Sequence, residues 1–181
     1  VLIIMPGLKF RILLDTKKNE EIFHDILIAD GEDFETFFQT IINSFEFKGD
    51  QMASFYVSNE TWDKGEEISL LDLSEGEESQ VQIMKDTKVK DHLLDRDQKF
   101  ILVYDFLKMW IFLIELIGVQ EDTPDSPQLV LSMGTNPKED SKELDEEFQM
   151  PADSGEKEDE DEFGFNDYED GFSEEDLNPY M

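Results

Sequence analysis

The sequence predicts an α+β fold: a mostly antiparallel sheet packed against one main amphipathic helix, followed by a disordered acidic tail. Short runs of strand-forming residues are separated by polar turns, and a single segment repeats its apolar residues at the helical period. Residues 1–120 carry 24 acidic and 12 basic residues, whereas residues 121–181 carry 22 acidic and three basic. We therefore expect an α+β domain over 1–120, a linker or edge segment over 121–137 and an acidic disordered tail over 138–181.

The first hairpin is predicted from two strand-like runs. Residues 8–15 (LKFRILLD) and 20–29 (EEIFHDILIA) are rich in strand-forming side chains, and the polar sequence between them indicates a turn. We expect His24 to be half-exposed on the second strand. The side chains expected on one side of that strand are Ile22, His24, Ile26 and Ile28.

The main helix is predicted over 33–47. Asp30 is a suitable N-cap, and the acidic residues that follow it complement the positive end of the helix dipole. Lys48 and Gly49 together form a typical stop signal. The apolar residues of this segment recur at the helical period: Phe34, Phe37, Phe38, Ile41, Ile42 and Phe45. We expect this face to form the centre of the core.

Shorter elements are predicted between this helix and the most apolar part of the chain. Thr87 is a possible cap, and Val89, Leu93 and Leu94 follow it at helical spacing, which predicts a short helix over 87–94. Further strands are expected at 52–58 and 81–84, and residues 67–73 are expected to form a strand or an extended edge.

The most apolar stretch, residues 99–119, predicts a central β-hairpin. Its two runs, KFILVYDF and WIFLIE, are rich in β-branched and aromatic residues, and Asp105 to Met109 would form the turn, although this segment has no glycine, asparagine or proline. The length of the stretch also matches a membrane span. The charges of Asp105 and Lys108 favour the hairpin, because a central charge costs roughly 2.5–3.5 kcal/mol in a spanning helix.

One more apolar run follows the central hairpin. A sequence rich in proline and aspartate at 122–127 indicates a linker, and residues 128–133 (QLVLSM) follow it. We expect this run to form either a final edge strand or a docking tail.

Several of these stretches, in this order, resemble the plasmid pRiA4b open-reading-frame-3-like family, also described as mobile-element passenger proteins. The resemblance covers about residues 7–118 and rests on LKFRILLDT, FFQTIINSFEFKGDQMASFYV and KVKDHLLDRDQKFILVYDF. It implies an α+β fold with a mostly antiparallel sheet, and it implies no particular activity. The positions that match the family motif are Tyr104, Asp105, Phe106 and Trp110.

The chain departs from this family pattern at positions that bear on chemistry. Glycine and an acid often follow the Tyr-Asp-Phe sequence in the family, whereas this chain has Leu107 and Lys108. Gln51 and Ala53 stand where the family often carries a pair of histidines. If the family shares a histidine–carboxylate site, this chain has lost most of it.

Composition narrows the classes of partner. The chain has no cysteine, which excludes disulfides, thiolate zinc sites and cysteine nucleophiles and suits a reducing cytoplasm. A net charge of −31 disfavours direct binding to nucleic acids or anionic membranes, because both require basic side chains. We therefore expect a cytoplasmic protein that has basic proteins as partners.

The sequence contains no catalytic, cofactor-binding or metal-binding motif. A Gly-x-Ser-x-Gly elbow and a phosphate-binding glycine loop are both absent, and an EF-hand-like window starting at Asp159 has Phe163 in its fifth position. His24 and His92 are the only histidines, and we expect His92 to be solvated. Asp105 is expected to be a turn or capping acid. The alternative is a metal-assisted hydrolase that uses Asp105 with His92 in a concave acidic site.

The acidic tail carries aromatic residues among its acids. Segments of this kind dock on basic, partly apolar surfaces. The main hypothesis is therefore a non-enzymatic interaction module whose tail binds or repels basic partners. The alternatives are a solvating tail with incidental aromatics, a weak divalent-cation buffer, and a tail that folds back on Lys85, Lys88 and Lys90. The candidate partner-binding residues are Phe163, Phe165, Tyr168, Phe172 and Tyr180.

Overall fold

The structure, a computed structural model, describes residues 6–75 and 80–143. The predictions for the tail aromatics and the EF-hand-like window concern residues that lie outside these ranges. In chain order the elements are β1 (Gly7–Leu14), β2 (Phe23–Ala29), α1 (Phe34–Ser44), β3 (Ala53–Ser58), β4 (Glu67–Ser69), β5 (Gln82–Ile83), the 3-10 turns η1 (Met84–Asp86) and η2 (Val89–His92), β6 (Lys99–Tyr104), β7 (Trp110–Gln120), β8 (Gln128–Met133) and the 3-10 turn η3 (Glu139–Ser141).

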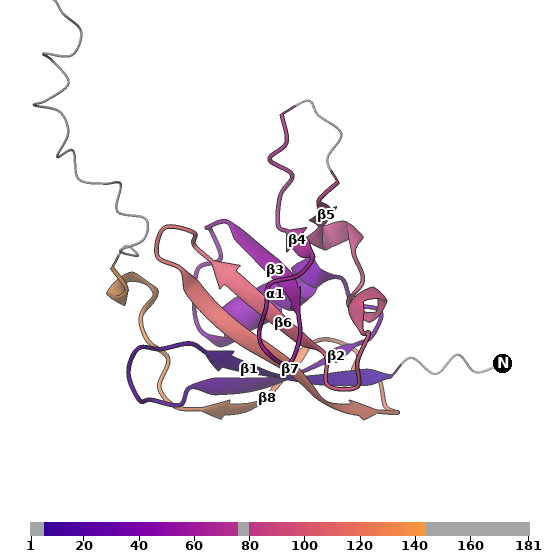
Figure 1. The fold of residues 1–181 in the computed structure, drawn as a ribbon. Coiled ribbons are helices and arrows are strands. Elements are labelled where there is room, and N and C mark those ends of the chain that lie inside the picture. The colour runs from indigo at the N-terminus through magenta and orange to yellow at the C-terminus, as the bar shows by residue number, and fades with distance from the viewer. Residues whose placement is uncertain (1–5, 76–79, 144–181) are drawn as a thin grey trace, which may run out of the picture. The chain divides into compact units, whose positions relative to one another are not determined.

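The eight strands form one sheet in the order β5-β4-β3-β6-β7-β1-β2-β8 (Figure 1). Every neighbouring pair is antiparallel except β4 and β5, which are parallel. Together with α1, this mostly antiparallel sheet confirms the predicted α+β class. Of the two alternatives for residues 128–133, the structure shows the edge strand, β8.

The two predicted hairpins form the middle of the sheet. β6 and β7 pair with Tyr104 opposite Trp110, and β1 and β2 pair with Leu13 opposite Phe23. The two hairpins join through β7 and β1. Among the described residues, no helix has the length and apolar character needed to cross a membrane.

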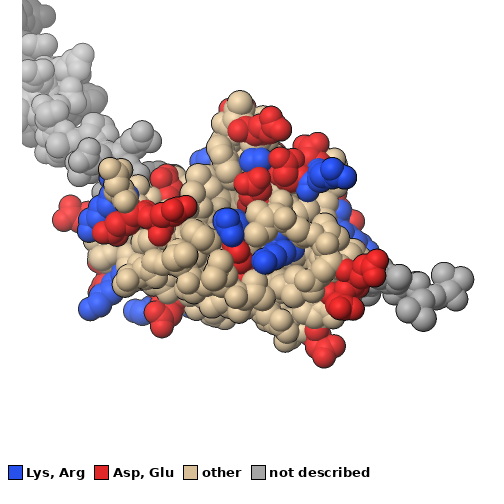
Figure 2. Space-filling view, turned by 90° about the horizontal axis from the view of Figure 1, so that it is seen from below, with Lys and Arg blue, Asp and Glu red and all other residues tan. Residues whose placement is uncertain are grey.

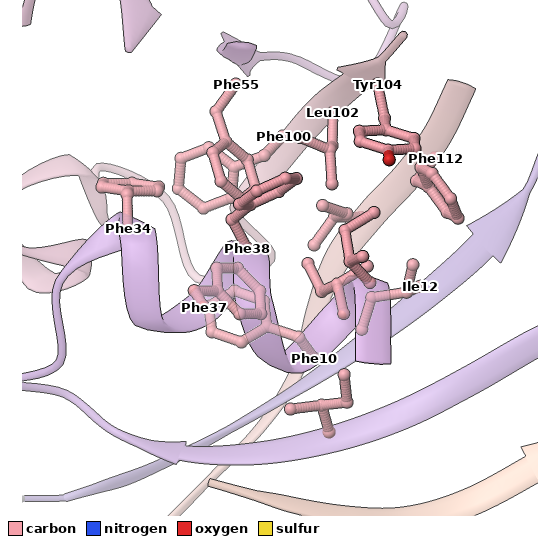
Figure 3. Packing of buried hydrophobic residues seen from close by; sticks show 14 of the residues in the cluster. Phe10, Ile12, Phe34, Phe37, Phe38, Phe55, Phe100, Leu102, Tyr104 and Phe112 are labelled. Atoms are coloured by element: carbon pink, nitrogen blue, oxygen red, sulfur yellow. The ribbon is translucent and has the colours of Figure 1, made fainter. Parts of the chain in front are cut away.

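Helix α1 lies between β3 and β6 on one side and β1, β2 and β8 on the other (Figure 1). The ring of Phe37 lies 4.8 Å from that of Phe10 on β1 and 5.6 Å from that of Phe55 on β3. The ring of Phe38 lies 6.0 Å from that of Tyr104, and these side chains converge in one cluster (Figure 3). The helix therefore supplies the aromatic centre of the core, because it bridges strands from both halves of the sheet.

The observed N-cap of α1 is Asp33 rather than the predicted Asp30. Asp33 has an extended backbone, and its Oδ1 accepts the amide of Thr36 at 2.7 Å. The amide of Phe34 donates to the carbonyl of Thr87, and that of Val89 donates to the carbonyl of Glu32. These bonds hold the residues before Phe34 in extended pairing, so the helix starts later than the charge pattern suggests.

The helix also ends earlier than predicted, at Ser44 instead of position 47. Glu46 takes a left-handed conformation (φ 63°), and its amide donates to the carbonyl of Asn43. The amide of Phe47 donates to the carbonyl of Ile42. This is a Schellman arrangement with glutamate in the position that usually holds glycine, which places the stop three residues before Gly49.

Two other local predictions are wrong. Residues 87–94 form no continuous helix, because Thr87 is extended between η1 and η2 and its backbone pairs with the start of α1. β4 ends at Ser69 rather than 73.

Both histidines are buried, whereas we expected a half-exposed His24 and a solvated His92. His24 is fully buried and His92 is 8% exposed. The ring of His24 stacks on Phe45 with centroids 3.9 Å apart, and the ring of Phe34 covers His92 at 5.8 Å. Their partners come from α1 or its C-cap, which the strand pattern alone does not reveal.

Candidate interaction site at the base of the acidic tail

Asp105 builds the turn between β6 and β7. These two strands and their turn carry the residues that match the family motif, and we call them the motif hairpin. The backbone of Asp105 is left-handed (φ 58°), as is that of Met109 (φ 55°). Oδ1 of Asp105 accepts the amides of Leu107 and Lys108 at 3.1 and 3.2 Å. Aspartate tolerates this conformation because its short side chain bonds to nearby amides. Asp105 is therefore the turn acid that we expected. It adopts the left-handed conformation that glycine usually supplies in such a turn, and its carboxylate bonds to the turn amides.

Tyr104, the last residue of β6, binds the segment that leads into the tail. Its hydroxyl donates to Oε1 of Glu139 at 2.7 Å and accepts the amide of Gly49 at 3.1 Å. The second oxygen of Glu139 accepts the amide of Lys48 at 2.8 Å. Burial and the neighbouring Glu139 carboxylate raise the pKa of Tyr104, so the phenol keeps its proton and remains a donor.

Trp110, the first residue of β7, binds the same segment a few residues later. Its ring lies 4.9 Å from that of Phe47, and Nζ of Lys142 lies 5.2 Å from the ring centroid. Nζ of Lys142 also donates to the carbonyl of Met109. The motif residues that flank the turn therefore bind both ends of η3.

A third contact is made by a residue that lies earlier in the chain than Glu139 and Lys142. The side-chain amide of Asn136 donates to the carbonyl of Ser44 at 3.2 Å, beside the buried His24. Nδ1 of His24 lies 2.9 Å from the hydroxyl of Ser44. We call residues 136–142 the anchor segment, because their side chains hold it against α1, β2 and the motif hairpin. Its last five residues belong to the region that the charge pattern assigns to the tail.

A pocket of about 270 Å³ lies beside the anchor segment. It opens between the turn that joins β1 to β2 and the residues around η3. Its apolar residues include Trp110 and Pro137. Its charged residues are three lysines and two acids: Lys17, Lys18, Lys142, Asp15 and Glu20.

The remaining motif residue and the hydrolase candidates lie elsewhere. Phe106 is half-buried and lines a different pocket, together with Leu71. Nε2 of His92 lies 2.7 Å from the side-chain oxygen of Gln82. His92 packs near Phe34 at the Phe100 end of β6, whereas Asp105 follows the opposite end.

The structure therefore does not bring Asp105 and His92 together. Across residues 6–75 and 80–143, no three histidine, aspartate or glutamate side chains lie close enough to hold a metal ion.

Sequence reasoning missed Glu139 and Lys142. Both belong to a polar run that reads like the rest of the acidic tail, and no local pattern marks them. Only their distances to Tyr104 and Trp110 show that they belong to the domain.

Comparison with known proteins agrees with this fold. A protein of unknown function from Methanosarcina mazei Go1, MM3350, has a crystal structure similar to this one, with a TM-score of 0.64 and 15% sequence identity. The similarity covers 77% of this chain and 75% of that one, and at this identity it shows the fold alone. No curated protein matches the chain.

The family comparison covers more of the chain than the resemblance noted in the sequence. The family of plasmid pRiA4b ORF-3-like proteins matches residues 6–180, so the match continues through the anchor segment and the acidic tail instead of ending near position 118. The chain therefore belongs to the plasmid pRiA4b ORF-3-like protein family.

Proposed function

We propose that this protein is a non-enzymatic, cytoplasmic interaction module whose acidic tail binds basic partner proteins. The observation that supports this most is the anchor segment, through which Tyr104 and Trp110 hold the chain just before its most acidic part. Residues 144–181 contain 16 acidic residues and one basic residue. The motif hairpin then has a mechanical role: it fixes the point from which the tail leaves the domain.

Electrostatics favours a partner outside the chain. The described residues carry 28 acidic and 14 basic side chains, so the domain and the tail have the same sign of charge. Apart from the pocket that Lys17, Lys18 and Lys142 line, like charges make docking of the tail on its own domain unfavourable, whereas a basic partner gains attraction from both. The attraction between exposed charges is screened beyond about 10 Å at 0.1 M salt, so the binding should be strongly salt-dependent.

The test compares two forms of the full-length protein in pull-downs from native cytosol at low and high salt. In one form, all aspartates and glutamates between positions 156 and 176 are replaced by asparagine and glutamine. We expect the natural chain to capture basic proteins at low salt only, and the neutralised form to capture none. A third form replaces Phe163 and Phe165 with leucine and keeps every charge, so it separates the contribution of the aromatic rings from that of the acids. Equal capture by the natural and neutralised chains would refute the proposal.

A further inference from the structure

The edge strand β8 has none of the charges that usually protect a sheet edge. It pairs with β2 on one side, and no other described strand pairs with its second side. All six residues of β8 are exposed, and none is charged. Its large apolar residues are 42–49% exposed: Leu129, Val130, Leu131 and Met133. Natural proteins usually protect such an edge with lysine, proline, short length or a covering loop.

The opposite edge of the sheet differs from β8. It is formed by β5, which has only two residues and leads directly into η1. β8 retains one protective feature, a register shift opposite Asp25 and Ile26 that leaves Val130 without a partner on β2. Of the two sheet edges, only β8 is long enough to accept a further strand.

On the sheet face that turns away from α1, β8 adjoins one charged row and one apolar row. In the charged row, Leu131 pairs with Asp25, which pairs with Arg11. Paired residues on neighbouring strands point to the same face, and Met133 pairs with Phe23, which pairs with Leu13. This row continues through Leu113 to Ile101. Figure 2, which views the molecule from below, shows uncharged surface interrupted by basic groups and an acidic group near the middle of the view, with further acidic groups at the rim. A strand added to β8 would therefore place alternate side chains beside Met133 and Leu131.

The segments that flank β8 are acidic. Glu121, Asp122 and Asp125 precede the strand. Glu139, Asp140 and Glu143 follow it, together with Lys138 and Lys142, and Glu139 already accepts from Tyr104 and Lys48. An incoming strand with basic residues would therefore meet opposite charge mainly at the segment that precedes β8. A second copy of this chain would bring another net charge of −31 and the same acidic flanks, which disfavours pairing of two β8 strands.

From these observations we propose that β8 is a docking site for an extended strand of a partner protein, with alternating apolar residues flanked by lysine or arginine. The backbone of that strand pairs with the free edge of β8, while its basic residues contact the acids that precede β8. This inference deepens the proposed function and rests on it for the basic character of the partner. The tail attracts the partner by charge, and β8 recognises its conformation.

The test measures the binding of labelled peptides to the full-length protein by fluorescence anisotropy. The main probe is Lys-Lys-Val-Thr-Val-Thr-Val-Lys-Lys; one control has glutamate in place of the lysines, and another has proline in place of the threonines. Poly-lysine is the probe for the tail alone. We expect each control peptide to bind at least about tenfold more weakly than the main probe, because one loses the charge match and the other the backbone pairing.

Three variants of β8, two disruptive and one conservative, locate the binding site. Val130→Pro removes an amide donor and places a ring at the strand edge, whereas Val130→Thr keeps the branched shape and the amide. We expect Val130→Pro to weaken binding of the main probe about tenfold and Val130→Thr to change it less than about twofold. Leu131→Lys introduces a repelling charge on a neighbouring exposed position and should act like the proline variant. Thermal melting checks that each variant is folded.

The outcomes separate this inference from the proposed function. Loss of main-probe binding in Val130→Pro and Leu131→Lys, with poly-lysine binding retained, supports a strand site on β8. Unchanged binding in Val130→Pro and Leu131→Lys would refute it, even if neutralising the tail abolished poly-lysine binding and so upheld the proposed function. Equal binding of the glutamate-flanked peptide would also refute it, as would a dimer that the β8 variants disrupt. If the natural chain did not bind poly-lysine, this would refute the role proposed for the tail and would leave the β8 site unaffected.

Discussion

The hydroxyl of Tyr104 donates a 2.7 Å hydrogen bond to Glu139, 35 positions further along the chain. Glu139 in turn accepts the amide of Lys48, so its carboxylate links the end of β6 to the loop after α1. Tyr104, which the sequence pattern marks only as a strand residue, thus determines where the C-terminal region meets the domain. The carboxylate has two donors, so removing either one weakens the attachment without abolishing it.

Tyr104→Phe should lower the free energy of unfolding by about 1–2 kcal/mol, because the half-buried carboxylate of Glu139 loses its phenol donor. Urea unfolding measures this change. Hydrogen exchange at the amide of Lys48 should also accelerate, since that amide donates to the same carboxylate. Tyr56→Phe is the matched control: the hydroxyl of Tyr56 lies 3.5 Å from Glu67, too far for a strong bond. Equal effects of the two substitutions would contradict the role assigned to Glu139.

Asp105→Ala should destabilise the domain by about 1–3 kcal/mol, because two amides lose their acceptor and alanine is strained at positive φ. Asp105→Asn keeps an acceptor oxygen and tolerates the left-handed conformation, so it should lose much less stability. Chemical denaturation of both variants tests this order. If the asparagine variant were as unstable as the alanine variant, the charge of Asp105 rather than its turn geometry would matter.

His24 should make stability depend on pH. Burial lowers the pKa of His24 below its ordinary value of about 6.5, and a contact with Asn136 and the charges of Asp25 and Glu46 only partly oppose this. Because the folded state binds the proton more weakly than the unfolded state, the contribution of His24 is complete above about pH 6.5 and is lost as pH falls through its folded pKa.

The measurement compares urea unfolding of the natural protein and His24→Gln between about pH 7.5 and pH 5. Carboxylates titrate in both proteins, so the difference between their unfolding free energies isolates His24. That difference should shift in favour of the glutamine variant as the pH falls. A constant difference across this range would show that His24 does not carry the pH dependence.

The ion pair of Arg11 and Asp25 supplies a fourth test. Two guanidinium nitrogens lie 2.8 and 2.9 Å from the oxygens of Asp25, which is only 1% exposed, and the guanidinium also covers the ring of Phe23. Arg11→Leu should cost about 1–3 kcal/mol, less than for a fully buried pair because Arg11 is half in solvent. The double variant Arg11→Leu with Asp25→Asn should recover part of this loss. A double variant less stable than the single one would contradict it.

Local patterns in the sequence predict much of this architecture. The period of Phe34, Phe37 and Phe38 predicts α1, and the apolar runs around the Asp105 turn predict the central hairpin. Both elements depend on side chains only a few positions apart, which is the range over which helix and strand patterns act. The family motif is also visible in the sequence, although the partners of its residues are not.

The sequence by itself determined the class of fold, the central hairpin and the concentration of acidic residues in the last third of the chain. Only the tertiary structure decided that α1 starts after Asp33, that both histidines are buried and that Glu139 belongs to the domain. Each of these outcomes depends on contacts between segments far apart in the chain. Packing supplies hydrogen-bond partners and excludes water at such sites, and no pattern of neighbouring residues records either effect.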